Sequence, residues 1–147
     1  MFEVGVDELG SSAMSREHAA KTAKEVKTYR DLITWRCAMD CAEEVLRLTD
    51  ENGLSRKFWL VDQIQRAVAS IAANIAEGHD GQFSKRMYLK HLFIARGSLA
   101  ETLTFLELAV RRKYINKEVG RTLWKQLQKS GRLINGLIRS LAAKKAA

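Results

Sequence analysis

The chain has 147 residues and a formal net charge of +8 at pH 7. This length allows one domain with a substantial core and is short for two. The sequence contains no proline, and its apolar residues recur at helical rather than alternating spacing, so we expect an all-α protein. Its apolar runs are too short to span a bilayer and its N-terminus lacks signal-peptide features, so we expect no membrane association and a cytoplasmic location.

The positive charge is concentrated at the C-terminal end of the chain. Residues 1–28 carry four basic and five acidic side chains, and residues 29–110 carry ten and eleven. Residues 111–147 carry eleven basic side chains and a single acidic one, Glu118. The whole positive excess therefore lies in the last quarter of the chain.

The first part of the sequence lacks a strong apolar face. We expect residues 1–28 to form an N-terminal tail, partly disordered or with one marginal helix at about residues 16–27, and residues 29–147 to form the folded domain. Thr28 and Asp31 have the spacing of a capping box, which predicts a helix over about residues 31–49 that stops before Gly53.

The two cysteines of the chain lie within this first predicted helix. Cys37 and Cys41 are four residues apart and no histidine is close in sequence. A disulfide would fit helix geometry poorly, and a zinc site would need more ligands. We therefore expect reduced thiols on the core side, and we predict no metal and no cofactor.

A second helix is predicted over about residues 57–77, closed by Gly78, and it has three different faces. Its apolar seam, expected in the core, consists of Val61, Ile64, Val68, Ile71 and Ile75. Its polar strip, expected against the third helix, consists of Gln63, Arg66, Ser70, Asn74 and Glu77. Its alanine face, interpreted as a subunit interface, consists of Ala69, Ala72, Ala73 and Ala76. Alanine is also the best helix former and needs no partner, so this face has a second explanation.

The polar strip of the second helix predicts hydrogen bonds across a hairpin. If the chain turns near residue 80, Ser70 lies level with His91 and Gln63 with Ser98. Structural hydrogen bonding explains such a strip, because buried polar groups need partners. The alternative is that Asn74 and Glu77 hold a ligand or brace the turn.

Two more helices complete the predicted fold. Ser84 is suited to cap the third helix, which at ~28 residues would be about 40 Å long, and Asn116 is suited to cap the fourth. Short links leave no chain for a crossover, so we expect an antiparallel up-down-up-down four-helix bundle. Arg96 falls in the apolar sector of the third helix and would need a carboxylate or interface partner if it were buried.

A basic stripe covers about a third of the circumference of the fourth helix, estimated from ~100° per residue. It consists of Lys117, Arg121, Lys125, Lys129, Arg132 and Arg139. Such a stripe suits the phosphates of RNA or DNA and would bind them without reading sequence. A solvated face that maintains solubility is the simpler explanation. A third is a protein adaptor without nucleic acid, in which the stripe meets an acidic protein and exposed aromatic side chains contribute. Those side chains are Trp59, Phe105, Tyr114 and Trp124.

The sequence does not predict an enzyme. The three histidines, His18, His79 and His91, lie apart. No glycine-rich phosphate loop occurs, and no Glu-x-x-His pair marks a di-metal bundle. We therefore expect a binding protein without catalytic residues.

Four segments of the sequence resemble one bacterial family. These are residues 70–78 with the pattern Ser-Ile-x-x-Asn-Ile-Ala-Glu-Gly, residues 94–101, the Tyr-x-Asp-Leu-x-x-Trp motif at residues 29–35, and residues 112–115. Over residues 29–141 the chain is similar to the four-helix-bundle proteins encoded in intervening sequences of large-subunit ribosomal RNA genes. The resemblance implies assembly into a ring of five. It also implies kinship with the accessory protein of diversity-generating retroelements, and hence an accessory role to a reverse transcriptase or ribosomal RNA.

Overall fold

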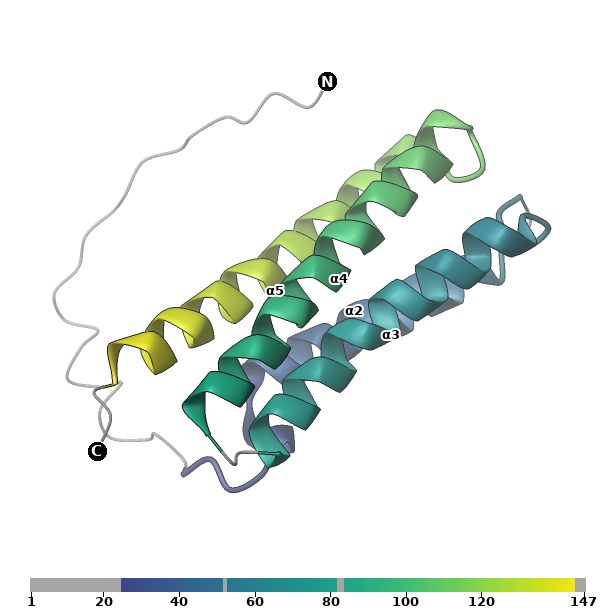
Figure 1. Cartoon of the computed structure of the whole chain (residues 1–147). Coiled ribbons are helices and arrows are strands. Elements are labelled where there is room, and N and C mark those ends of the chain that lie inside the picture. Colours follow the sequence, from purple (N-terminus) through teal and green to yellow (C-terminus); the bar gives the residue numbers. More distant parts are fainter. Residues whose placement is uncertain (1–24, 52, 82–83, 145–147) are drawn as a thin grey trace, which may run out of the picture.

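The protein is all-helical in the computed structural model shown in Figure 1, which describes residues 25–51, 53–81 and 84–144. The elements are the short 3-10 helix η1 (Tyr29–Asp31) and the helices α2 (Ile33–Thr49), α3 (Phe58–Asp80), α4 (Lys85–Arg111) and α5 (Lys117–Ala143). The described residues contain no strand, and none of their helices is both long and apolar enough to cross a bilayer. The predicted all-α class is confirmed.

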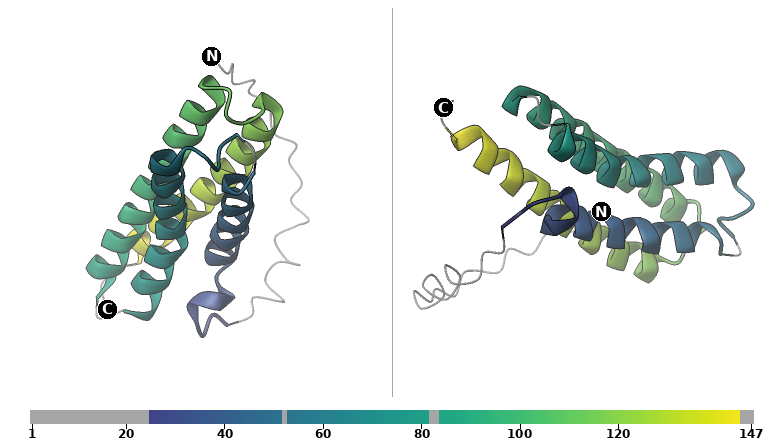
Figure 2. Two further views of the ribbon diagram at one scale, coloured as in Figure 1. Left: turned by 90° about the vertical axis from the view of Figure 1, so that its right-hand side faces the viewer. Right: turned by 90° about the horizontal axis from the view of Figure 1, so that it is seen from below.

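The four long helices form an antiparallel bundle. α3 packs against both α2 and α4, and α5 packs against α4 and α2, so each helix has two helical neighbours. Figures 1 and 2 show consecutive helices running in opposite directions, with α2 and α3 forming one hairpin and α4 and α5 the other. This is the predicted up-down-up-down arrangement, and it follows from links too short for a crossover.

The core consists of the predicted apolar seams. Ile64, Val68, Ile71 and Ile75 of α3 are fully buried. They meet similarly buried side chains from the other helices, among them Val45, Leu92, Leu127 and Ile134. Each such side chain contributes roughly 1.5–3 kcal/mol to folding through its burial, so the seams account for why these four amphipathic segments associate.

The helix α3 ends later than predicted, and Gly78 is not its stop. α3 continues to Asp80, and the N–H of Gly81 donates to the carbonyl oxygen of Glu77 at 2.9 Å. A Cβ at Gly78 would lie 2.8 Å from Cδ2 of Tyr88 and 2.9 Å from Cβ of His91. Gly78 therefore allows α4 to approach α3 closely, a role that sequence alone did not distinguish from termination.

The caps predicted for the third and fourth helices are confirmed, whereas the capping box of Thr28 and Asp31 caps η1 and does not start α2, which begins at Ile33 without a side-chain cap. Oγ of Ser84 accepts a hydrogen bond from the N–H of Met87 at 3.2 Å, and Oδ1 of Asn116 accepts one from the N–H of Glu118 at 2.7 Å. The carboxylate of Asp31 accepts from the N–H of Thr28 at 3.0 Å. Most of the N-terminal tail lies outside the described residues, and its described part, residues 25–28, is not helical.

The two cysteines are free thiols. Cys41 is buried on the core side of α2 and Cys37 is half-buried. Burial raises the pKa of Cys41 to about 12, with a smaller contribution from Cys37. The thiol of Cys41 is therefore neutral at physiological pH, as expected for a packing residue.

Candidate nucleic-acid interface

The basic stripe of α5 lies opposite the side of the helix that enters the core. The buried side carries Leu123, Leu127 and Ile134, which recur at helical spacing. Four exposed members of the stripe are Lys125, Lys129, Arg132 and Arg139. Lys117 is exposed in the first turn and Arg121 is partly exposed. The fold thus directs the stripe outward, away from the apolar seam of the same helix.

Two members of the stripe lie near carboxylates. Nη1 of Arg121 lies 3.0 Å from Oε1 of Glu118, one turn earlier on α5. Lys129 lines a small pocket with Asp40 and Glu44 of α2. Among the described residues no ion pair involves Lys125, Arg132 or Arg139. The charge of the stripe is therefore least compensated at Lys125 and over the C-terminal half of α5, which carries Arg132 and Arg139.

The first half of α4 adds further cations beside that half of α5. A Cβ at Gly131 of α5 would lie 2.7 Å from Cδ2 of Leu99, so the two helices approach closely there. Nζ of Lys85 donates to the carbonyl oxygen of Lys144 at 2.6 Å, which places the start of α4 beside the end of α5. Residues 84–100 contain no acidic side chain, and residues 119–147 contain none either. The exposed cations of these two segments, which we call the basic face, are Lys85, Arg86, Lys90, Arg96, Lys125, Lys129, Arg132, Arg139 and Lys144.

Arg96 belongs to this face and not to the core. Its side chain is exposed, and its guanidinium carbon lies 5.1 Å from the centroid of the Phe93 ring. A buried Arg96 would have required a carboxylate partner. The exposed guanidinium does not, because it remains in contact with water and interacts with the ring of Phe93.

The α2–α3 hairpin has the opposite charge. Residues 29–84 carry six basic and nine acidic side chains, whereas residues 85–147 carry fifteen basic and three acidic ones. Acidic and basic groups of α2 and α3 also pair within one helix, as in Arg66 and Asp62, whose Nε and Oδ2 lie 2.9 Å apart. An approaching polyanion would therefore be directed to the α4–α5 hairpin.

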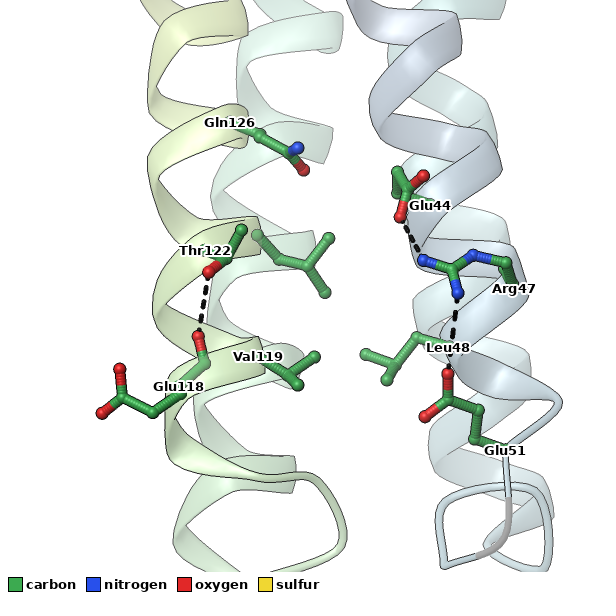
Figure 3. A pocket seen from close by; sticks show the side chains of 9 residues that line it. Glu44, Arg47, Leu48, Glu51, Glu118, Val119, Thr122 and Gln126 are labelled. Atoms are coloured by element: carbon green, nitrogen blue, oxygen red, sulfur yellow. Dashed lines mark hydrogen bonds and ion pairs between the residues drawn. The ribbon is translucent and has the colours of Figure 1, made fainter.

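A pocket between α2 and α5 is lined by three glutamates, one arginine, and apolar and uncharged polar side chains (Figure 3). Arg47 lies between Glu44 and Glu51, with Nη2 2.5 Å from the first carboxylate and Nη1 3.9 Å from the second. Glu118 on α5 points away from α2 in this view. The pocket contains no unpaired cation for a phosphate. Across residues 25–51, 53–81 and 84–144, no three His, Cys, Asp or Glu side chains are grouped as metal ligands.

The polar strip of α3 makes the predicted hydrogen bonds to α4, in a different register. Oγ of Ser70 lies 2.8 Å from Oγ of Ser98, and Oδ1 of Asn74 lies 3.1 Å from Nδ1 of His91. The predictions that Ser70 is level with His91 and Gln63 with Ser98 are wrong, because α3 extends past Gly78 and the chain turns later than residue 80. The side-chain amide of Asn74 also donates hydrogen bonds to Ser70, so this side chain has a structural role in the contact between α3 and α4.

The alanine face needs one correction. Ala69 and Ala73 are exposed and Ala76 is half-buried, but Ala72 is only 4% exposed and belongs to the core. Ala72 lies one helical turn after Val68, on the buried side of α3, so no second subunit can contact its side chain directly. The exposed alanine face consists of Ala69, Ala73 and Ala76.

Part of the basic face was missed by sequence reasoning. Lys85, Arg86 and Lys90 belong to a segment whose overall charge is balanced, and only the fold places them beside α5. The sequence does contain one local signal, the absence of acidic residues between Asp80 and Glu101.

Comparison with known proteins identifies the family of the chain. A solved structure with a TM-score of 0.66 and 25% sequence identity covers 73% of this chain and 99% of its own. It is a protein of unknown function from the S23 ribosomal protein family of Bacteroides thetaiotaomicron VPI-5482. No curated protein sequence matches significantly. The family model for the 23S rRNA-intervening sequence protein matches residues 30–136, and the chain therefore belongs to that family.

Proposed function

We propose that this protein binds RNA or DNA through the phosphate backbone, using the basic face of α4 and α5, and that it is not an enzyme. The observation that carries the proposal is the run of exposed cations in two neighbouring helical segments that contain no acidic residue. Each phosphate neutralised by Lys or Arg releases counterions and adds affinity without reading bases. Binding is therefore tolerant of sequence and sensitive to salt.

The surplus charge supports a ligand more than it supports solubility alone. A solvated surface gains solubility from interspersed charges of both signs, whereas a large field of one sign steers a partner and destabilises the folded chain by self-repulsion. The α2–α3 hairpin has the interspersed pattern and the α4–α5 hairpin does not. RNA is the first ligand to test, because the family is described by its connection with 23S rRNA.

The protein acts as a homo-oligomer in this proposal, with a ring of five as the state implied by the family resemblance. The exposed alanine face, Ala69, Ala73 and Ala76, serves as the subunit contact because it lets a second backbone approach closely. Several basic faces in one assembly would bind one strand multivalently and raise the apparent affinity. An accessory role to a reverse transcriptase or ribosomal RNA in the cytoplasm is the setting we propose.

Fluorescence anisotropy with labelled RNA and DNA oligonucleotides tests the proposal. The double variant Arg132→Gln/Arg139→Gln should bind more weakly and reduce the slope of log affinity against log salt by about 1.4–1.8, because two phosphate contacts are lost. The matched control is Arg36→Gln/Arg66→Gln, which removes two exposed cations from the acidic hairpin. It should leave binding unchanged.

Equal effects of the two double variants would contradict a localised interface. An absence of binding at low ionic strength would contradict nucleic-acid binding itself. In that case, a complex with an acidic protein that survives nuclease treatment would favour the adaptor function, for which Trp59, 62% exposed on α3, offers an aromatic contact.

A further inference from the structure

The first half of α4 exposes apolar side chains among the cations of the basic face. Met87 and Ile94 are both 41% exposed and Phe93 is 48% exposed. These three line one shallow surface pocket together with Lys85, Arg86 and Lys90. Phosphate binding alone does not require exposed apolar side chains. Their presence here therefore suggests that this surface also contacts an apolar or aromatic group of its ligand.

The ring of Phe93 is accessible and sits among cations. Lys90 lies one turn before Phe93 on the exposed side of α4, and Arg96 lies one turn after it with its guanidinium over the ring. Gly97 also follows by one turn, and a Cβ built there would meet no atom within 4 Å. No side chain at position 97 therefore shields the ring, and space beside it is open.

We propose that this surface binds single-stranded nucleic acid, with an unpaired base stacked on Phe93 and the adjoining phosphates held by Lys90, Arg96 and Arg86. The proposal rests on the proposed function and specifies its ligand. Aromatic side chains and cations in one groove are the combination by which proteins hold single strands without sequence preference. The bases of a duplex are already stacked on one another, so Phe93 would favour an unpaired strand.

Charge and position favour nucleic acid as the occupant. Residues 84–100 carry four cations and no acidic side chain, so the occupant is an anion. The surface is continuous with the basic face of α5, because the start of α4 lies beside the end of α5. A strand that follows the cations of α5 would therefore pass over Phe93.

The test compares two probes on the full chain, a short oligouridylate and an abasic ribose-phosphate oligomer of the same length. The wild type should bind oligouridylate about ten-fold more tightly, since one stacked base is worth roughly 1–3 kcal/mol. Phe93→Ala should remove this difference and leave abasic binding unchanged. Phe93→Tyr, which retains the ring, should preserve it. Leu46→Ala is the control, because Leu46 is an exposed apolar residue of α2 outside this surface, and it should behave as the wild type.

The outcomes separate this inference from the proposed function. Equal, salt-sensitive binding of both probes by the wild type would overturn the stacking role and leave phosphate binding intact. Binding of neither probe would remove the proposed function and this inference together. Light scattering of Phe93→Ala should match the wild type, and a smaller assembly would overturn the inference by showing that the surface joins copies of the chain.

Discussion

The two hairpins of this bundle have the same internal construction and opposite exteriors. Both are antiparallel helix pairs that contribute fully buried aliphatic side chains to one core. The α2–α3 segment, residues 29–84, has a net charge of −3 from six basic and nine acidic side chains. The α4–α5 segment, residues 85–147, has a net charge of +12 from fifteen basic and three acidic ones. The core fixes the fold and leaves the outer surface free to differ, so the exterior is where the function of this fold is specified.

The pairing of charges shows the same contrast. On α2 and α3 most arginines have a carboxylate one turn away, as in Arg47 with Glu44 and Arg66 with Asp62. On α4 and α5 such pairs occur near the link between the helices, where Arg111 meets Glu107 and Arg121 meets Glu118. Exposed pairs of this kind add little stability. Their distribution matters because it leaves the far end of the α4–α5 hairpin strongly positive.

The largest expected effect comes from reversing charge on one hairpin at a time. Arg132→Glu/Arg139→Glu should weaken RNA binding by about 100-fold or more at low salt, because two phosphate contacts are replaced by repulsion. Arg36→Glu/Arg66→Glu, the matched change on the acidic hairpin, should alter affinity only slightly. Anisotropy titrations of both variants measure this, and circular dichroism should show both folded. Equal losses would mean that total charge alone governs binding.

The contact between α3 and α4, where the two hairpins meet, should tolerate an added methyl group at Gly78 poorly. Gly78→Ala places a Cβ within 3 Å of both Tyr88 and His91, and we expect it to lower the free energy of unfolding by about 1–3 kcal/mol. Gly97→Ala is the control on α4, where nothing obstructs the new methyl group, and should raise stability by about 0.5–1 kcal/mol. Urea denaturation measures both. Stabilisation by Gly78→Ala would mean that α3 and α4 are not closely packed there.

Removing either of two buried hydroxyl groups at the contact between α3 and α4 should change the stability of the protein by different amounts. Oγ of Ser98 is hydrogen-bonded to Ser70, so Ser98→Ala should cost about 1 kcal/mol. The hydroxyl of Tyr88 is buried without a hydrogen-bond partner among the described residues. Tyr88→Phe should therefore be neutral or slightly stabilising. Thermal denaturation checks both, and a clear loss for Tyr88→Phe would reveal a partner for the hydroxyl.

The smallest effect concerns Cys41 on the α2–α3 hairpin. Its folded pKa, about 12, lies above its ordinary value of 9.0. Only the unfolded chain releases this proton above about pH 9, so the contribution of Cys41 to stability should fall as pH rises from there toward 12. Unfolding at neutral and alkaline pH should show a shallower decline for Cys41→Ala than for the wild type. Native Cys41 should also resist alkylation at neutral pH, and rapid labelling would contradict its burial.

The fold was more predictable than the interface because each helix reports its own buried face. The spacing of Ile64, Val68 and Ile71 required a core seam, and the caps Ser84 and Asn116 marked helix starts through local hydrogen bonds. The role of Gly78 was predicted wrongly because a glycine can either end a helix or allow a second helix to approach closely. Only the positions of Tyr88 and His91 on α4 show that the second role applies. That single error shifted the predicted register of the α3–α4 hairpin.

The interface was predictable only in the part that one helix carries. The stripe on α5 was visible as charge per segment, since Glu118 is the last acidic residue of the chain. The contribution of α4 could not be seen in the same way, because the charges of Lys85 to Arg96 were counted in one segment with the acidic residues of α2 and α3. Ala72 was assigned to a subunit interface as one member of the alanine face, although its position one turn from Val68 places it in the core.

The salt dependence of single-stranded RNA binding by the wild-type protein tests the central claim most directly. If the basic face holds a phosphate backbone, log affinity should fall linearly with log salt, with a slope of about −0.7 for each phosphate neutralised. Engagement of Lys125, Arg132, Arg139 and Arg96 together predicts a slope of about −3. A slope near zero, or no binding at low ionic strength, would contradict the account.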